Sequence, residues 1–294
     1  MSERKITCTN NDGDSMTFTE TALSPFLLYS AEGVYDMQTK VMITDNTMTD
    51  GANYLGSTAK YRNIVLTLVD TEIDTPFSEN REMLNKLFKR GVTGTLLFEE
   101  DDNKRAIEYY VEDMHSDGTH TKRLHTVSLL CPDPFFYDPE ETEVTFAEWI
   151  SAFEFLHEFT ANGEELGYYT AAYKDIYNAS ADENIGLTII ITGSADVVNP
   201  GIVRFESDES IQVGSELHPF TLLQGDTLTI TTHTGNKHIY LTHNGVTTEV
   251  NQYMTEDSVF IQLMRGDNNI GFLAASGGAS MVVKMMYRIR YVRA

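Results

Sequence analysis

Two groups of histidines have a regular spacing from which a metal site could be built. They recur at every fifth position and are His115, His120 and His125 in the first half, and His233, His238 and His243 in the second. A zinc site usually combines closely spaced pairs of histidine or cysteine into four ligands. Neither group contains such a pair, so polar positions at strand edges and turns explain both groups better. The sequence predicts no metal ion and no cofactor.

The segment Asn10-Asn11-Asp12-Gly13-Asp14-Ser15 looks like the start of a calcium-binding loop. Such a loop needs glycine at its sixth position and a bidentate glutamate at its twelfth. Counted from Asn10, these positions hold Ser15 and Thr21. Because Asp-Gly tolerates the positive φ values of tight turns, the segment predicts a β-hairpin between residues 6–9 and 15–19.

Acidic residues are the remaining candidates for catalysis. Glycosidases use two carboxylates in fixed positions, but no motif singles out such a pair, and the run Glu99-Glu100-Asp101-Asp102 is typical of a solvated turn. The chain also lacks a Gly-x-Ser-x-Gly turn, a phosphate-binding loop and a dinucleotide fingerprint. The sequence therefore favours a protein that is not an enzyme.

Composition restricts the classes of partner. The 294 residues carry a net charge of −23, spread over both halves of the chain, and this field repels nucleic acid and anionic membranes. No segment approaches the roughly 20 apolar residues of a membrane helix. The two cysteines, Cys8 and Cys131, fit buried free thiols, although the sequence leaves a bridge between them open.

We expect a mostly β protein of two domains, residues 1–138 and 139–294. The first should be a β-sandwich-like domain with one helix at about 79–90, capped by Ser78 and stopped by Gly91. Alternating apolar residues predict the strands that surround this helix, at 63–70, 94–98, 106–113 and 121–131.

A polar excursion at about 34–62 contains little core-forming material. Long segments of this kind inside a domain are usually functional arms. Its strand-like run and its aromatic and basic residues give the candidate subunit contacts Met42, Ile43, Tyr54 and Arg62.

The end of the first domain is marked by prolines around an aromatic cluster. The residues of this candidate junction are Pro132, Pro134, Phe135, Phe136 and Tyr137. Each proline forces an extended conformation on the residue before it. We expect a pinned exit from the first domain and not a free linker.

The second domain shows many short strands between turns, which is typical of a sandwich or jelly roll. Strands are predicted at 187–191, 201–205, 227–232, 238–242 and 259–263, and the segment 281–291 reads as one long strand. On one face of that last strand lie the cations Lys284, Arg288 and Arg290. They fit either the protective charges of an edge strand or a basic stripe that docks on an acidic surface.

The chain resembles the distal tail proteins of siphophages over nearly its full length. The resemblance is carried by residues 127–137 (VSLLCPDPFFY), 178–191, 225–230 and 263–270, and by the order hairpin, arm, strand, helix and strands. Residues 142–179 match the family only loosely. The family defines no catalytic residues.

The resemblance implies a virion protein of the tail tip or baseplate that assembles in the cytoplasm of a bacterial host. Its N-terminal domains would form a hexameric ring around the DNA channel under the tail tube. The arm would reach a neighbouring subunit, and a galectin-like C-terminal sandwich would hold receptor-binding proteins for host attachment.

Two rival functions remain at this stage. A carbohydrate-binding tail-tip module is supported by the aromatic residues Tyr168, Tyr169 and Tyr173, although Trp149 is the only tryptophan. A tail-associated hydrolase would need a positioned acid or nucleophile, which the motifs do not provide.

Overall fold

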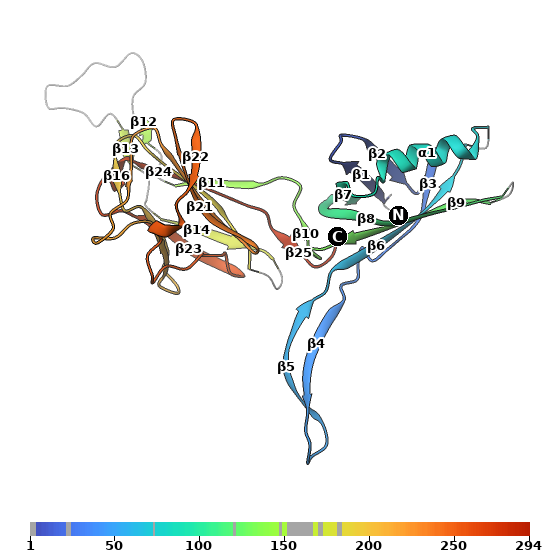
Figure 1. Ribbon diagram of the computed structural model, residues 1–294, viewed down its shortest axis with the longest axis horizontal. Coiled ribbons are helices and arrows are strands. Elements are labelled where there is room, and N and C mark those ends of the chain that lie inside the picture. Colours follow the sequence, from blue (N-terminus) through green and yellow to red (C-terminus); the bar gives the residue numbers. More distant parts are fainter. Residues whose placement is uncertain are drawn as a thin grey trace. The chain divides into compact units, whose positions relative to one another are not determined.

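The computed structural model describes residues 4–21, 25–72, 74–119, 122–146, 149–151, 167–169, 173–180 and 184–294. They form two compact units. Unit 1 comprises Met1–Pro139 together with the C-terminal segment Arg290–Ala294, and unit 2 comprises Glu140–Ile289. The predicted mostly-β fold with a single α-helix and a long arm is confirmed within these residues (Figure 1).

Unit 1 is built on a closed barrel of seven strands. In spatial order its strands are β8 (Asn103–Thr119), β7 (Thr93–Glu100), β1 (Lys5–Asn10), β2 (Ser15–Thr19), β3 (Phe26–Glu32), β6 (Arg62–Asp70) and β9 (Lys122–Cys131). Pairing of β8 with β9 closes the ring, so the expected sandwich-like sheet curls onto itself. Along β6 every second side chain is buried, with Ile64, Leu66 and Leu68 in the barrel core.

The helix α1 (Phe77–Leu87) packs on this barrel (Figure 1). Its buried Leu84 and Leu87, with Phe88 behind them, join the same core, where Phe88 stacks on Phe18 with ring centroids 6.3 Å apart. The helix begins one residue before the predicted cap, because Pro76 occupies the N-cap position and Phe77 starts the first turn. The predicted Ser78 cap is therefore wrong, since no side chain caps the helix.

The predicted arm is a two-stranded antiparallel hairpin of β4 (Thr39–Asp45) and β5 (Ala52–Ala59) that leaves the barrel between β3 and β6 (Figure 1). Every residue of β4 is exposed, as are six of the eight in β5. The hairpin therefore contributes no side chain to the barrel core, which agrees with the shortage of core-forming residues in its sequence.

Unit 1 ends on a short ladder formed by β10 (Phe136–Tyr137) and β25 (Arg290–Tyr291). Strand β10 pairs in turn with β8, so the ladder extends the barrel sheet. The segment 281–291 was expected to be one long strand. It is broken at Arg288 and Ile289, because β24 (Met281–Tyr287) belongs to unit 2 and β25 belongs to unit 1.

Unit 2 is a sandwich of two main sheets. The first has the order β11 (Thr142–Phe146), β24, β15 (Thr188–Gly193), β20 (Thr227–His233), β21 (Asn236–His243) and β22 (Val246–Glu249). The second has the order β14 (Tyr173–Asn178), β23 (Gly266–Leu273), β17 (Gly201–Arg204) and β18 (Glu209–Gln212). Side chains from both sheets fill one core, for example Ile189, Val283, Ile202 and Ile270.

Short elements complete unit 2. They are the pairs β12 (Trp149–Ser151) with β13 (Gly167–Tyr169) and β16 (Val197–Val198) with β19 (Thr221–Leu222), and the 3-10 turns Asn251–Tyr253 and Gly278–Ser280. The strand predicted at 259–263 is wrong. In that segment Leu263 forms an isolated bridge with Ile185 and the Val259 amide donates to the Ser210 carbonyl, while the buried Ile261 and Leu263 reach the core.

Candidate functional site

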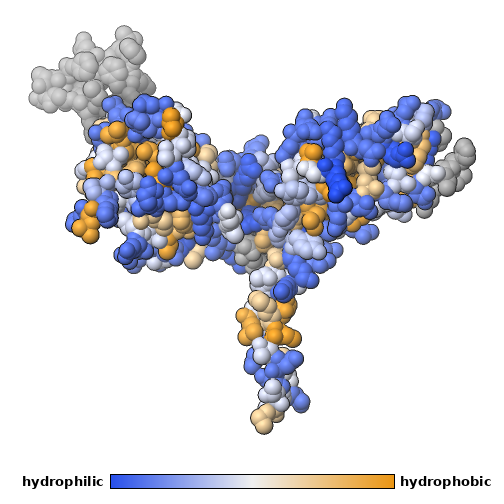
Figure 2. Space-filling model, in the orientation of Figure 1, coloured by the Kyte–Doolittle hydropathy of each residue, from blue (hydrophilic) through white to orange (hydrophobic). Residues whose placement is uncertain are grey.

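The arm presents an apolar face to solvent. Ile43 and Tyr54 are directly paired across the hairpin, and Val41 lies two residues from Ile43 on the same side. Their exposed fractions are 56% for Val41, 59% for Ile43 and 65% for Tyr54. In Figure 2 apolar atoms gather on the part of the arm nearer the barrel. Exposed apolar groups concentrated in this way mark interaction sites.

The predicted contact residue Met42 points to the other side of the hairpin and is 39% exposed. A register shift lies between Met42 and Ile43, where Leu55 is the additional residue of the opposite strand. Within the described residues β4 and β5 pair only with each other, so both outer edges of the hairpin offer backbone donors and acceptors. An isolated two-stranded hairpin has marginal stability in water, so a partner surface would stabilise it.

The predicted contact residue Arg62 has a different position from the other three. It lies at the root of the arm, is only 3% exposed and cannot reach a neighbouring subunit. Its guanidinium donates to backbone carbonyls at three places in unit 1. The acceptors are Pro134 (Nε, 2.7 Å), Gly33 and Asp36 (Nη1, 2.7 Å each), Val34 (Nη1, 3.1 Å) and Val292 (Nη2, 2.6 Å). Arg62 is therefore an internal anchor of the arm.

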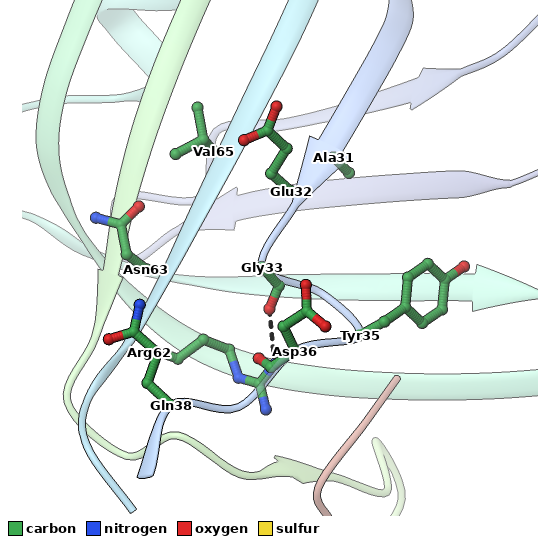
Figure 3. Close-up of a pocket in the computed structure, with 9 residues that line it drawn as sticks. All are labelled: Ala31, Glu32, Gly33, Tyr35, Asp36, Gln38, Arg62, Asn63 and Val65. Carbon is green, nitrogen blue, oxygen red and sulfur yellow. Dashed lines mark hydrogen bonds between the residues drawn. The ribbon is translucent and has the colours of Figure 1, made fainter. Parts of the chain in front are cut away.

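An open hollow of about 580 Å³ lies beside this anchor (Figure 3). It is lined by the end of β3, by the root segment between β3 and β4 and by the start of β6, with Glu32, Tyr35, Asp36 and Asn63 among its residues. The Tyr35 hydroxyl donates to Glu100 at 2.8 Å, and partial burial with this bond raises the pKa of Tyr35 to about 12. Through this bond Tyr35 joins the arm root to the end of β7.

The predicted junction is pinned inside unit 1. Phe135 and Phe136 are buried, and the Arg62 guanidinium lies 4.9 Å from the centroid of the Phe136 ring. Arg290 packs over Phe135 at 4.4 Å and pairs with the carboxylate of Asp133 at 2.6 Å. The proline-bracketed aromatics thus act as a fixed end of the barrel sheet, with Tyr137 in β10 paired to both β8 and β25.

No protein-family model matches the chain, and no curated protein matches it in sequence. Its fold, in contrast, matches solved structures. The Dit protein of phage SPP1, described as a paradigm of the hub adsorption apparatus in phages that infect Gram-positive bacteria, aligns with a TM-score of 0.68. The alignment covers 97% of this chain and 98% of that chain at 14% identity.

The chain shares the fold of this SPP1 Dit protein. Two structures of the baseplate of phage P2 in its activated conformation, with calcium and with strontium, match at TM-scores of 0.54 and 0.52. Each match covers all of both chains at 12% identity. At such identities the fold alone is shared, so the features of this chain's own surface carry its functional interpretation.

The candidate basic strand is divided between two sheets. Strand β24, with Lys284, lies between β11 and β15 and is not an edge strand, whereas β25, with Arg290, is the edge strand of the sheet in unit 1. The Lys284 ammonium is 2.9 Å from the Glu143 carboxylate on β11, and Arg290 pairs with Asp133. Arg288 is exposed in the break that follows β24. A docking role for these cations stays a prediction, and two of them already have carboxylate partners within the chain.

The histidines take separate partners. His233 bonds to Thr188, His238 lies 2.6 Å from Glu249, and His243 lies 2.7 Å from Asp226. His120 lies outside the described residues. Among the residues the structure describes, no group of His, Cys, Asp and Glu is arranged to hold a metal, and no helix has the length and apolar character to cross a membrane. Cys8 and Cys131 are buried free thiols.

Sequence reasoning missed two clusters. One is the anchoring of β25, where the Tyr291 ring lies 3.6 Å from the Arg105 guanidinium and its hydroxyl donates to Asp138. The other is the buried His125, which bonds to Ser116 and stacks on Phe77 with ring centroids 5.0 Å apart. The Arg105–Tyr291 contact and the stacking of Phe77 on His125 join residues distant in sequence, so no local spacing could have revealed them.

Proposed function

We propose that this protein is a structural component of a phage tail, the distal hub that joins the tail tube to the tail tip or baseplate. Two observations together support this function. The fold matches the SPP1 hub over nearly the whole of both chains. The chain also carries an arm whose apolar side chains are exposed to solvent in the monomer and would be buried by a partner. The protein acts by assembly and has no catalytic role.

The proposed assembly is a hexameric ring. Unit 1 forms the ring, and its arm places Val41, Ile43 and Tyr54 against the neighbouring subunit, while unit 2 holds receptor-binding proteins. Six copies at a charge of −23 each would surround the channel with a negative field that lets DNA pass without adhering. The protein then resides in the virion tail after assembly in the host cytoplasm.

The arm tests this assembly directly. The variant Ile43→Lys places a charge on the apolar face, whereas Thr44→Lys places the same charge on the opposite side of the same strand. We expect rings in negative-stain images and a hexamer mass by light scattering for the parent and Thr44→Lys, with loss of both for Ile43→Lys. A parent that stays monomeric at high concentration and with its tail-tube partner, or equal assembly of both variants, would contradict the proposal.

A second candidate function is binding of host cell-wall saccharides by unit 2. Tyr173 and Tyr177 are both exposed on the outer side of β14, with Asp175 between them. Asp175 accepts a bond of 2.6 Å from the Asn269 side chain on the adjacent strand. The side chains of Tyr168 and Tyr169 lie outside the described residues. Calorimetry with cell-wall saccharides distinguishes the two functions. A binding heat in the parent protein that is absent in Tyr177→Ala supports sugar binding, whereas isotherms without binding heat in the parent support the hub function only.

A further inference from the structure

The guanidinium of Arg62 joins segments that are far apart in the sequence. It holds the arm root through Gly33 and Asp36, the junction through Pro134 and the C-terminal segment through Val292. These acceptors, and the fifth at Val34, all belong to unit 1. In Figure 3 the Arg62 side chain reaches under the root segment, and a dashed line marks its bond to Gly33.

Only arginine has the donors for this position. Its five N–H groups form a planar fork, while lysine offers three donors from a single point. A buried carbonyl without a donor costs free energy, so the root, the junction and the C-terminal segment all depend on the one side chain. Within the described residues no carboxylate forms an ion pair with Arg62, so the surrounding carbonyl dipoles are its main compensation.

The Val292 carbonyl reaches Arg62 only while β25 is docked. Docking depends on two side chains of that strand. Tyr291 lies against Arg105 and donates to Asp138 at 3.1 Å, and Arg290 pairs with Asp133. When β25 separates from β10, Arg62 loses the Val292 acceptor and the segment that shields it from solvent. Water then gains access to the carbonyls of the arm root.

The arm root begins with a turn that requires glycine. Gly33 has φ +81°, and a Cβ atom there would lie 2.0 Å from the Asn63 carbonyl oxygen. A residue with a side chain could not adopt this turn. Beyond it, Val34 is buried in the barrel core and the Tyr35 hydroxyl bonds to Glu100, so the Arg62 bond to Asp36 is the further tie between the root and the barrel before β4 begins.

We propose that Arg62 is a conformational clamp through which the docking of β25 fixes the direction of the arm. With β25 docked, the arm root is held against β6 and the arm points in one direction. With β25 released, the hold of Arg62 on Asp36 weakens and the arm pivots beyond Tyr35, where the core contact of Val34 and the Tyr35–Glu100 bond end. This inference rests on the geometry of unit 1 and holds whether or not the protein forms a ring.

The test measures the distance between the arm tip and the barrel with nitroxide labels on Met48→Cys and Asp102→Cys in the full chain. Met48 is 95% exposed near the tip, and Asp102 is exposed in the turn between β7 and β8. The native Cys8 and Cys131 are buried, so labelling is selective for the new thiols. Electron paramagnetic resonance then gives the width of the distance distribution.

Three variants distinguish the contribution of Arg62 from that of the docked strand β25. Tyr291→Ala removes the ring that holds β25, Tyr291→Phe keeps the ring on Arg105 and loses only the hydroxyl, and Arg62→Lys keeps the charge but not the fork. We expect Tyr291→Ala and Arg62→Lys each to widen the distribution at least twofold, and Tyr291→Phe to leave it unchanged. Because both act through one contact, their combination should be no wider than either alone.

Several results would overturn the clamp. An unchanged width in Arg62→Lys rejects it, and so does an unchanged width in Tyr291→Ala when hydrogen exchange at residues 290–292 rises tenfold. Additive broadening in the combined variant would show two independent effects. If Tyr291→Ala leaves that exchange unaltered, Arg290→Ala is added to release the strand, and circular dichroism confirms that each labelled variant is folded.

Discussion

A methyl group at Gly94 would have a large and specific effect on unit 1. Gly94 on β7 is paired directly with Tyr109 on β8, whose ring covers the glycine inside the barrel. A Cβ atom at Gly94 would lie 2.4 Å from Cζ and 2.5 Å from the hydroxyl oxygen of Tyr109, and 2.8 Å from the Thr9 carbonyl oxygen. The ring would have to move by roughly an ångström to restore ordinary contact.

That movement is blocked, because the Tyr109 ring is buried against Phe88 with centroids 6.2 Å apart. Overpacking of a filled core costs about 1–3 kcal/mol, and contact with both a ring and a backbone carbonyl places Gly94→Ala at the upper end. At about 2–4 °C per kcal/mol for a unit of this size, we expect the melting temperature of unit 1 to fall by roughly 6–12 °C.

Differential scanning calorimetry measures this shift. Gly278→Ala is the matched control, because a Cβ atom there meets nothing nearer than the Ala274 Cβ at 3.8 Å. Tyr109→Leu should recover part of the loss when combined with Gly94→Ala, since it removes the ring tip but not the Thr9 carbonyl. A Gly94→Ala protein that melts within 1 °C of the parent would refute the packing described for β7 and β8.

Three further predictions follow from buried groups of unit 1. Burial lowers the pKa of His125, with Asp70 opposing and Arg81 adding to the effect, so the folded state favours the neutral ring. The free energy of unfolding in urea should therefore be highest above about pH 6.5 and fall as the pH decreases below it. His125→Leu should flatten this pH dependence, and an equal slope in both proteins would exclude His125 as its source. Burial raises the pKa of the Cys8 thiol, and it raises the pKa of the Cys131 thiol to about 12. Neither thiol should therefore react with a thiol reagent at pH 8 until urea unfolds the barrel. Rapid reaction of the native protein would contradict this burial. The buried carboxylate of Asp70 accepts hydrogen bonds from Asn80 at 2.9 Å and from Arg123 at 3.3 Å. Asp70→Ala should therefore lower the free energy of unfolding by about 3–5 kcal/mol, as measured by urea denaturation with the exposed Asp102→Ala as the control. A loss equal to that of the control would show that these hydrogen bonds contribute nothing to stability.

Patterns within one element predicted the corresponding parts of the fold well. The strand β6 and the helix α1 could be predicted from their apolar periodicity, because each element packs one side against one core. The arm could be predicted for the opposite reason, because its strands face no core and its sequence lacks core-forming residues. The break after Tyr287 was not readable, since Arg288 and Ile289 continue the alternation and only the return of the chain to β10 interrupts the strand.

Long-range pairing limited the prediction of the site. Closure of the barrel depends on the register between β8 and β9, with a shift at Val111 and Asp113 that no local signal announces. Arg62 was selected as a charged residue at the end of the arm, and its sequence neighbours gave no sign that a cation would be buried there. Its acceptors lie up to 230 positions away, so its role is a property of the tertiary structure alone.

The ladder between β10 and β25 has a consequence for how such chains change over time. Tyr137 and Arg290 are direct partners in it, so the chain leaves unit 1 and returns to it about 5 Å apart. A two-residue hairpin turn could bridge that gap, as could any domain whose termini lie close together. In chain order unit 2 therefore occupies the position of a loop, and recombination could exchange it for another domain while the strand pairing of the barrel and the arm is kept.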